Sequence, residues 1–131
     1  MPQMANITVK AANGTTDVVY NALTPSSGDK TAARWRVEAA STYAAQKPAL
    51  SLVSQDNGPK TARKVTMMYK YPVVETINGL PTIIGYIPFE ITGTIPLQVS
   101  DSGVAEGVHQ VGNLLCSALI RDCFKTGYSA S

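Results

Sequence analysis

Apolar and polar residues alternate along much of the first hundred positions of the chain, and this alternation predicts β-strands. The alternation is most regular between residues 63 and 71. One side of that segment carries Val65, Met67, Tyr69 and Tyr71, and the other carries Lys64, Thr66, Met68 and Lys70. The segment is therefore expected to be a half-buried strand, and Pro72 is expected to end it.

Shorter segments of the same kind surround this strand, with turn signals between them. Residues 6–11 and 16–20 flank an Asn13-Gly14 turn and predict an N-terminal hairpin. The remaining predicted strands cover residues 33–39, 48–55 and 83–99. The sequence Asp-Asn-Gly-Pro at 56–59 predicts a tight turn. Residues 73–82 contain Asn-Gly and Pro, which indicates a loop or the tip of a hairpin.

After Ser100 the spacing of apolar residues changes to steps of three and four, which predicts a helix. The apolar stripe consists of Val104, Val108, Val111, Leu115 and Leu119. Asp101 or Ser102 is expected to cap the N-terminus of this helix, and Gly127 to end it. Gly112-Asn113 is a weak point at which the helix is expected to kink or divide, so the tail is one helix or two.

Together these elements predict one α+β domain over residues 1–131, with antiparallel strands first and helices last. The hairpin would occupy about residues 6–21, the sheet about 33–99 and the helical tail about 102–126. An antiparallel sheet has an apolar face to cover. A helix of about 25 residues spans at most ~36 Å and covers only part of that face. We therefore expect a second copy of the chain to complete the cover in an obligate dimer.

Charge is scarce and unevenly distributed along the 131 residues. Only 15% of the residues are charged, against about 25% in a typical protein, and the net charge is +2. Eight basic and two acidic residues lie between Lys30 and Lys70, whereas the rest of the chain holds three basic and seven acidic residues. This basic middle is compatible with a polyanionic partner or with an ordinary solvated sheet face. Charge alone leaves both interpretations open.

The sequence gives little support for catalysis or for a metal site. His109 is the single histidine, so a His/Cys metal cluster cannot be assembled, and there is no phosphate-binding glycine loop or nucleophile elbow. In a helix, Cys116 and Cys123 would lie ~10 Å apart along the axis, too far for a disulfide. No apolar run is long enough for a transmembrane helix, and the N-terminus does not resemble a secretion signal. We therefore expect no enzymatic activity, no cofactor and no membrane partner.

The polar side of the predicted sheet is the stronger candidate for function. If the strands are neighbours, lysines, hydroxyls and a tyrosine share one face. Cations bind phosphates, hydroxyls contact base edges and tyrosine stacks on bases, so this mixture suits single-stranded or looped RNA. A plain solvent-facing sheet surface shows the same alternation and remains the alternative.

Residues 57–66, Asn-Gly-Pro-Lys-Thr-Ala-Arg-Lys-Val-Thr, resemble the central turn and strand of coat proteins of the single-stranded RNA bacteriophages. Thr94-Ile95-Pro96-Leu97, followed by Ser100-Asp101, is similar to the last strand of that family where it enters the helices. The order and spacing of elements agree over nearly the whole chain. The resemblance implies an N-terminal hairpin, a five-stranded antiparallel sheet and C-terminal helices, with two chains interlocked as a dimer.

The resemblance also implies a function and partners. Dimers would assemble into a quasi-equivalent icosahedral shell, with the polar sheet face turned inward onto single-stranded genomic RNA. The same face would bind an RNA stem-loop that represses translation and marks the genome for packaging. The phage maturation protein would be a further partner, and the virion, assembled in the bacterial cytoplasm, would be the location. A cellular RNA-binding module that forms no shell is the alternative, and a shell protein without stem-loop recognition is a third possibility.

By position, the resemblance implies RNA contacts on alternate residues of three strands. They are Lys47, Ser51, Val53, Gln55, Lys64, Thr66, Met68, Lys70, Tyr86, Glu90 and Thr92. Two positions depart from the family pattern: Met68 stands where a polar or basic residue is common, and Pro88 where some members have a stacking tyrosine. Tyr86 would substitute for that tyrosine. Residues 73–82 contain no cysteine, so no disulfide between subunits is expected there.

Overall fold

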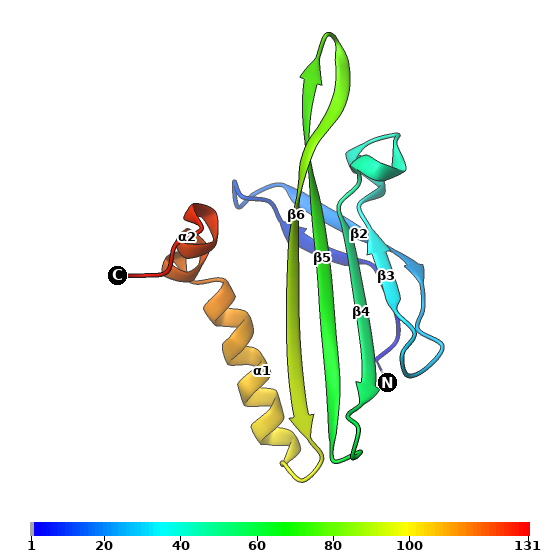
Figure 1. The fold of residues 1–131 in the computed structure, drawn as a ribbon, viewed down its shortest axis with the longest axis vertical. Coiled ribbons are helices and arrows are strands. Elements are labelled where there is room, and N and C mark those ends of the chain that lie inside the picture. Colours follow the sequence, from blue (N-terminus) through cyan, green and yellow to red (C-terminus); the bar gives the residue numbers. More distant parts are fainter. Residues whose placement is uncertain (1) are drawn as a thin grey trace. The chain divides into compact units, whose positions relative to one another are not determined.

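The computed structural model describes residues 2–131, and most of them belong to one antiparallel meander of six strands followed by two helices (Figure 1). The strands are β1 (Ile7–Lys10), β2 (Asp17–Thr24), β3 (Ala33–Arg36), β4 (Ala49–Asp56), β5 (Ala62–Ile77) and β6 (Leu80–Pro96). Their order in the sheet is the order in the chain. The predicted α+β class is confirmed. The two hairpin strands and the four strands that follow form a single six-stranded sheet, where a hairpin beside a five-stranded sheet was expected.

The helices are α1 (Asp101–Leu115) and α2 (Ala118–Thr126). The chain divides into two compact units, one reaching Thr94 and one running from Ile95 to Ser131. The helical tail, expected from the sequence to be one helix or two, contains two. Neither helix of the described residues has the length and apolar character required to cross a bilayer.

Local sequence explains where each helix begins and ends. The N-cap of α1 is Ser100, whose Oγ accepts the Gly103 N–H at 3.3 Å, so the prediction of Asp101 or Ser102 was wrong by one or two residues. The division lies at Ser117, which caps α2, and not at Gly112-Asn113. The Ser117 side chain accepts a backbone N–H at the start of α2, which stabilises a new helix at that point. Gly112 and Asn113 are weak helix formers but provide no such cap. Gly127 ends α2 in the left-handed conformation, as predicted.

The prediction that Pro72 ends its strand was wrong, because β5 runs on to Ile77. The ladder between β4 and β5 stops at the pair Ala49–Lys70. Beyond Lys70, the edge of β5 that faces β4 makes no ladder hydrogen bonds with β4. Pro72, which has no N–H to donate, is therefore tolerated within the strand. The predicted tip at residues 73–82 is a hairpin turn of two residues. Asn78 and Gly79 have φ of 52° and 78°, as such turns require.

Strand β3 is shorter than the predicted 33–39, because the chain turns after Arg36 into two short 3₁₀ helices, η1 (Glu38–Ala40) and η2 (Ala44–Gln46).

The apolar face of the sheet holds an aromatic group on strands that are distant in sequence. The hydroxyls of Tyr20 on β2 and Tyr69 on β5 are 2.8 Å apart, and Phe89 of β6 lies 6.2 Å from the Tyr69 ring. Val37 and Ala62 are buried, as are the prolines at 48 and 72.

Candidate nucleic-acid interface

The register of β3, β4 and β5 places polar residues of three strands in rows on one face of the sheet, because paired residues point to the same side. Ala49 of β4 pairs with Arg36 on one side and Lys70 on the other. Ser51 pairs with Arg34 and Met68 in the same way. Two further rows join Val53 to Thr66 and Gln55 to Lys64. We call this surface the polar face.

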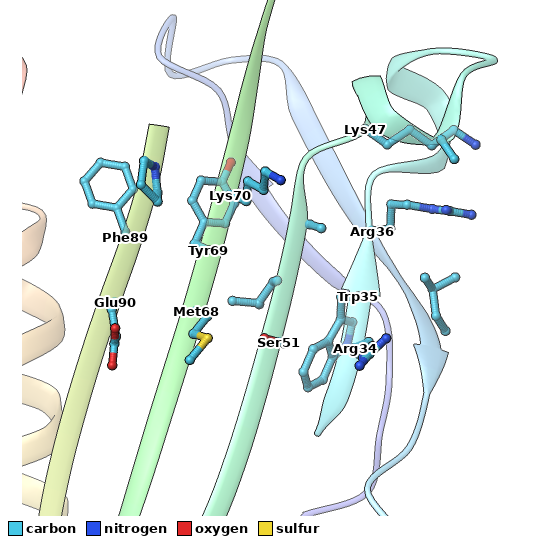
Figure 2. A pocket seen from close by; sticks show the side chains of 15 residues that line it. Arg34, Trp35, Arg36, Lys47, Ser51, Met68, Tyr69, Lys70, Phe89 and Glu90 are labelled. Atoms are coloured by element: carbon cyan, nitrogen blue, oxygen red, sulfur yellow. The ribbon is translucent and has the colours of Figure 1, made fainter. Parts of the chain in front are cut away.

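A hollow of about 740 Å³ lies at the Ala49 and Ser51 rows of the polar face, and its lining also includes Tyr69 and Phe89 of the apolar face (Figure 2). Its lining includes the side chains of Arg34, Arg36, Lys47, Ser51, Met68, Lys70 and Glu90. Five strands, β2 to β6, contribute to it together with η2 and the residue that follows η2. Four of these seven side chains are cationic and one is acidic, which favours a phosphate-bearing ligand. The other eight lining residues are apolar or aromatic, which suits contact with the bases of such a ligand.

Lys70 joins β6 to this surface. Its Nζ lies 3.9 Å from the centroid of the Tyr86 ring, which is a cation–π contact. Both side chains are exposed. The contact places a stackable ring beside a cation, and RNA-binding surfaces use this combination to hold a base and its phosphate together.

Two of the cations around the hollow are already paired with Glu38. Lys47 Nζ donates to Glu38 Oε2 at 2.7 Å, and Arg36 donates to Glu38 Oε1 at 2.8 Å. These hydrogen bonds, first that of Lys47 and then that of Arg36, hold the pKa of the Glu38 carboxyl below its ordinary value. Glu38 is therefore ionised at neutral pH and neutralises part of the positive charge.

The other cations of the polar face have no such partner. Among the described residues, no carboxylate lies within 4.0 Å of a side-chain nitrogen of Arg34, Lys64 or Lys70. All three side chains are exposed. They are the cations that phosphates in solvent can reach without displacing an existing ion pair.

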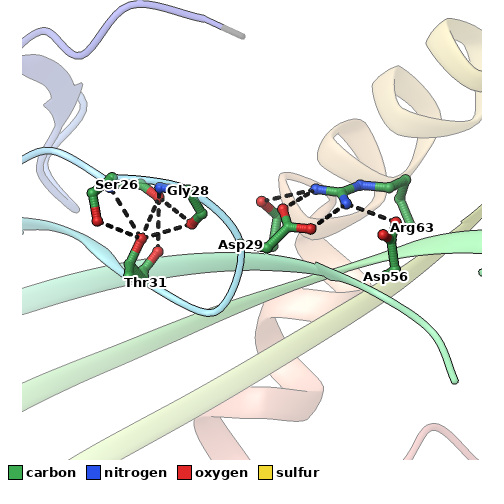
Figure 3. Close-up of polar contacts among 8 residues, drawn as sticks. Ser26, Gly28, Asp29, Thr31, Asp56 and Arg63 are labelled. Atoms are coloured by element: carbon green, nitrogen blue, oxygen red, sulfur yellow. Dashed lines mark hydrogen bonds and ion pairs between the residues drawn. The ribbon is translucent and has the colours of Figure 1, made fainter.

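The opposite end of β5 is held by a cluster of three charged side chains around Arg63 (Figure 3). Arg63 donates to both oxygens of Asp29, at 2.7 and 2.8 Å, and to Asp56 at 2.8 Å. The Arg63 hydrogen bond lowers the pKa of the Asp29 carboxyl. This cluster attaches the loop between β2 and β3 to the β4–β5 hairpin. Arg63 is thereby occupied in holding the fold.

The structure brings most of the predicted site residues onto the polar face. Ser51, Val53, Gln55, Lys64, Thr66, Met68 and Lys70 occupy its rows, and Lys47, Tyr86 and Glu90 lie at the hollow or against Lys70. Thr92 is an exposed residue of β6 that does not line the hollow. Thr66 keeps only 9% of its surface exposed, so it offers little to a ligand.

Arg34 and Arg36 line the hollow and were missed as site residues. The sequence did show them alternating with Trp35 and Val37. That alternation indicated a half-buried strand but left its neighbours unknown. Only the pairing of Arg34 with Ser51 and of Arg36 with Ala49 places them beside the predicted site.

Among the described residues, no group of three or more His, Cys, Asp or Glu side chains is placed to hold a metal ion.

No protein-family model and no curated protein matches the sequence. Solved structures do match over nearly the whole chain. The virus-like particle of Beihai levi-like virus 21 has a TM-score of 0.82 at 14% identity and covers 99% of both chains. The virus-like particle of bacteriophage NT-214 has 0.81 at 17%, covering 99% of this chain and 100% of the other.

The capsid protein of bacteriophage GA is also similar, with a TM-score of 0.74 at 19% identity and 95% coverage of both chains. At identities this low, the structural match establishes the fold and nothing further. The chain has the fold of the subunits in these phage particles, which confirms, for the fold, the resemblance noted in the sequence.

Proposed function

We propose that this chain is the coat protein of a single-stranded RNA bacteriophage, a structural subunit that assembles into a shell around RNA. The observation that carries the proposal is the match to subunits of phage particles over 99% of the chain, helices included. A fold alone does not determine a function. The second support is the polar face, whose unpaired cations and stackable tyrosine suit RNA.

Self-association is supported by apolar side chains that the single chain leaves in solvent. On α1, Val108, Val111 and Leu114 have exposed fractions of 59%, 51% and 58%. On the sheet, Ile84 and Ile87 of β6 have exposed fractions of 53% and 44%. Exposed apolar groups of this extent are typical of surfaces that contact another protein. A second copy of the chain, and then further copies in a shell, would bury them.

The shell would enclose RNA, and the polar face would contact it. Arg34, Lys64 and Lys70 are the cations that would bind phosphates, and Tyr86 would stack on a base. The same face would bind an RNA stem-loop that serves as packaging signal, and the protein bound there would repress translation. An interlocked dimer, the maturation protein as a partner and assembly in the bacterial cytoplasm belong to the same proposal.

The direct test is expression of the full chain in bacteria, followed by electron microscopy of the purified protein and sequencing of any RNA inside. We expect closed particles that contain RNA. A protein that remains monomeric or dimeric under all conditions would refute the shell. Small, soluble complexes of defined stoichiometry with RNA would favour a cellular RNA-binding module.

The RNA contacts are tested with Lys64→Ala and Lys70→Ala, and Lys125→Ala on α2 serves as the matched control. Each removes one positive charge, but only the first two remove it from the polar face. We expect each of the two to reduce the salt slope of single-stranded RNA binding by about 0.7, the value for one lost phosphate contact. Thr66→Ala is a poor probe, because Thr66 is buried and its loss would disturb packing. Particles with RNA binding unchanged in both lysine variants would indicate a shell protein that holds RNA elsewhere.

A further inference from the structure

The Glu38 carboxylate forms ion pairs with two of the cations that line the hollow. Lys47 and Arg36 each contact a different oxygen of its carboxylate, at 2.7 and 2.8 Å. Arg36 uses both Nε and a terminal nitrogen for the same Oε1 atom. An arginine binds phosphate through this fork of N–H groups. In this structure the fork is engaged by a carboxylate of the same chain.

The surrounding segment holds the Glu38 carboxylate in this position. Glu38 begins η1, and its backbone N–H donates to Asn21 Oδ1 of β2. Lys47 follows η2, and only 12% of its side chain is exposed. A cation this strongly covered requires a nearby negative charge. The three charges therefore form one unit that presents a net charge of one cation instead of two.

We propose that Glu38 is an electrostatic gate on the polar face, which withholds Arg36 and Lys47 from RNA phosphates and so weakens sequence-independent binding of single-stranded RNA. The proposal rests on the proposed function, since it assumes that the polar face binds RNA. Contacts to phosphate supply affinity for any sequence. With two cations withheld, binding depends more on the unpaired Arg34, Lys64 and Lys70 and on contacts to bases.

The test is Glu38→Gln in the full-length protein, compared with Glu75→Gln. Both variants remove one negative charge from an acid on the sheet unit. Glu75, an exposed residue of β5, has no ion pair among the described residues. Binding of a fluorescent oligouridylate is measured by anisotropy at several salt concentrations. We expect Glu38→Gln to bind more tightly and to steepen the salt slope by about 0.7 for each recruited phosphate, up to about 1.4.

A second pair of variants tests the gate in the protein with Glu38 intact. Arg36→Gln is expected to change the salt slope by less than half as much as Arg34→Gln, because Arg36 is occupied and Arg34 is not. In the Glu38→Gln background, Arg36→Gln is expected to remove part of the gained slope. This non-additivity is the signature of two residues that act on each other. The comparison of Arg36→Gln with Arg34→Gln does not need the Glu38→Gln variant, so it tests the proposal even if Glu38→Gln does not fold.

The outcomes separate the gate from the proposed function. If the unaltered protein binds the oligonucleotide with no salt dependence, the RNA-binding role of the polar face is wrong. If it binds with a salt-dependent affinity, but Glu38→Gln matches Glu75→Gln, only the gate is wrong. A loss of slope in Arg36→Gln equal to that in Arg34→Gln also overturns the gate.

Discussion

The hydroxyl pair formed by Tyr20 and Tyr69 joins β2 to β5, although β3 and β4 lie between them in the sheet. The two oxygens are 2.8 Å apart and the ring centroids 6.1 Å apart. Tyr69→Phe removes the hydrogen bond and keeps the ring. The variant therefore isolates one polar contact of the apolar face, with little change in its packing.

The expected cost is about 1 kcal/mol in the free energy of unfolding, the usual net value of one hydrogen bond in a protein. A hydroxyl left unpaired in a dry core would cost up to ~3 kcal/mol. Tyr20 and Tyr69 are each half-buried, so water can reach the remaining hydroxyl and keep the cost near the lower value.

The same contact has a consequence at alkaline pH. Burial, and then the hydrogen bond with Tyr20, raises the pKa of the Tyr69 hydroxyl above its ordinary value. A raised pKa in the folded state gives stability that is complete below the ordinary tyrosine pKa of ~10 and is lost as the pH rises above it. Phenylalanine cannot ionise, so the stability of Tyr69→Phe is expected to fall less steeply above pH ~10.

Urea unfolding followed by circular dichroism measures both effects, at matched protein concentrations because self-association adds to the apparent stability. Tyr71→Phe is the control: this neighbour on β5 is 45% exposed and makes no side-chain hydrogen bond among the described residues. The double variant Tyr20→Phe/Tyr69→Phe should cost less than the sum of the single variants. If Tyr69→Phe and Tyr71→Phe lose the same stability at neutral pH, the reasoning is refuted.

Two further predictions concern the loops of the sheet. Arg63 lowers the pKa of the Asp29 carboxyl, so this ion pair gives stability above the ordinary aspartate pKa and loses it as the pH falls through the lowered value. Asp29→Asn should therefore have a flatter acid limb of melting temperature against pH, and parallel limbs would contradict this. The chain has three Asn-Gly sequences, and Asn78 should deamidate first. The side-chain oxygens of Asn13 and Asn57 each accept two backbone N–H groups, which hold these side chains in place. The side-chain oxygen of Asn78 accepts none among the described residues. Peptide mapping of aged protein checks this order, and equal rates would be the contrary result.

The sequence predicted the strands well because alternation is a local property. A residue's side of its own strand follows from its parity, so Lys64 and Lys70 could be assigned to one face without a structure. Turn and cap residues are local in the same sense, and the Asn78-Gly79 turn and the end of α2 at Gly127 lie where the sequence placed them. The extension of β5 past Pro72 was not predictable, because it depends on where β4 stops pairing.

The sequence by itself thus determined the order of elements, the two faces of each strand and the resemblance to the phage coat-protein fold. The tertiary structure alone decided which residues of different strands meet. Arg34 stands beside Ser51, and Glu38 between Arg36 and Lys47, because of strand register and the path of the 3₁₀ segment. The physical reason is that register depends on turn geometry and on pairing between distant segments, and alternation within one strand carries no information about either.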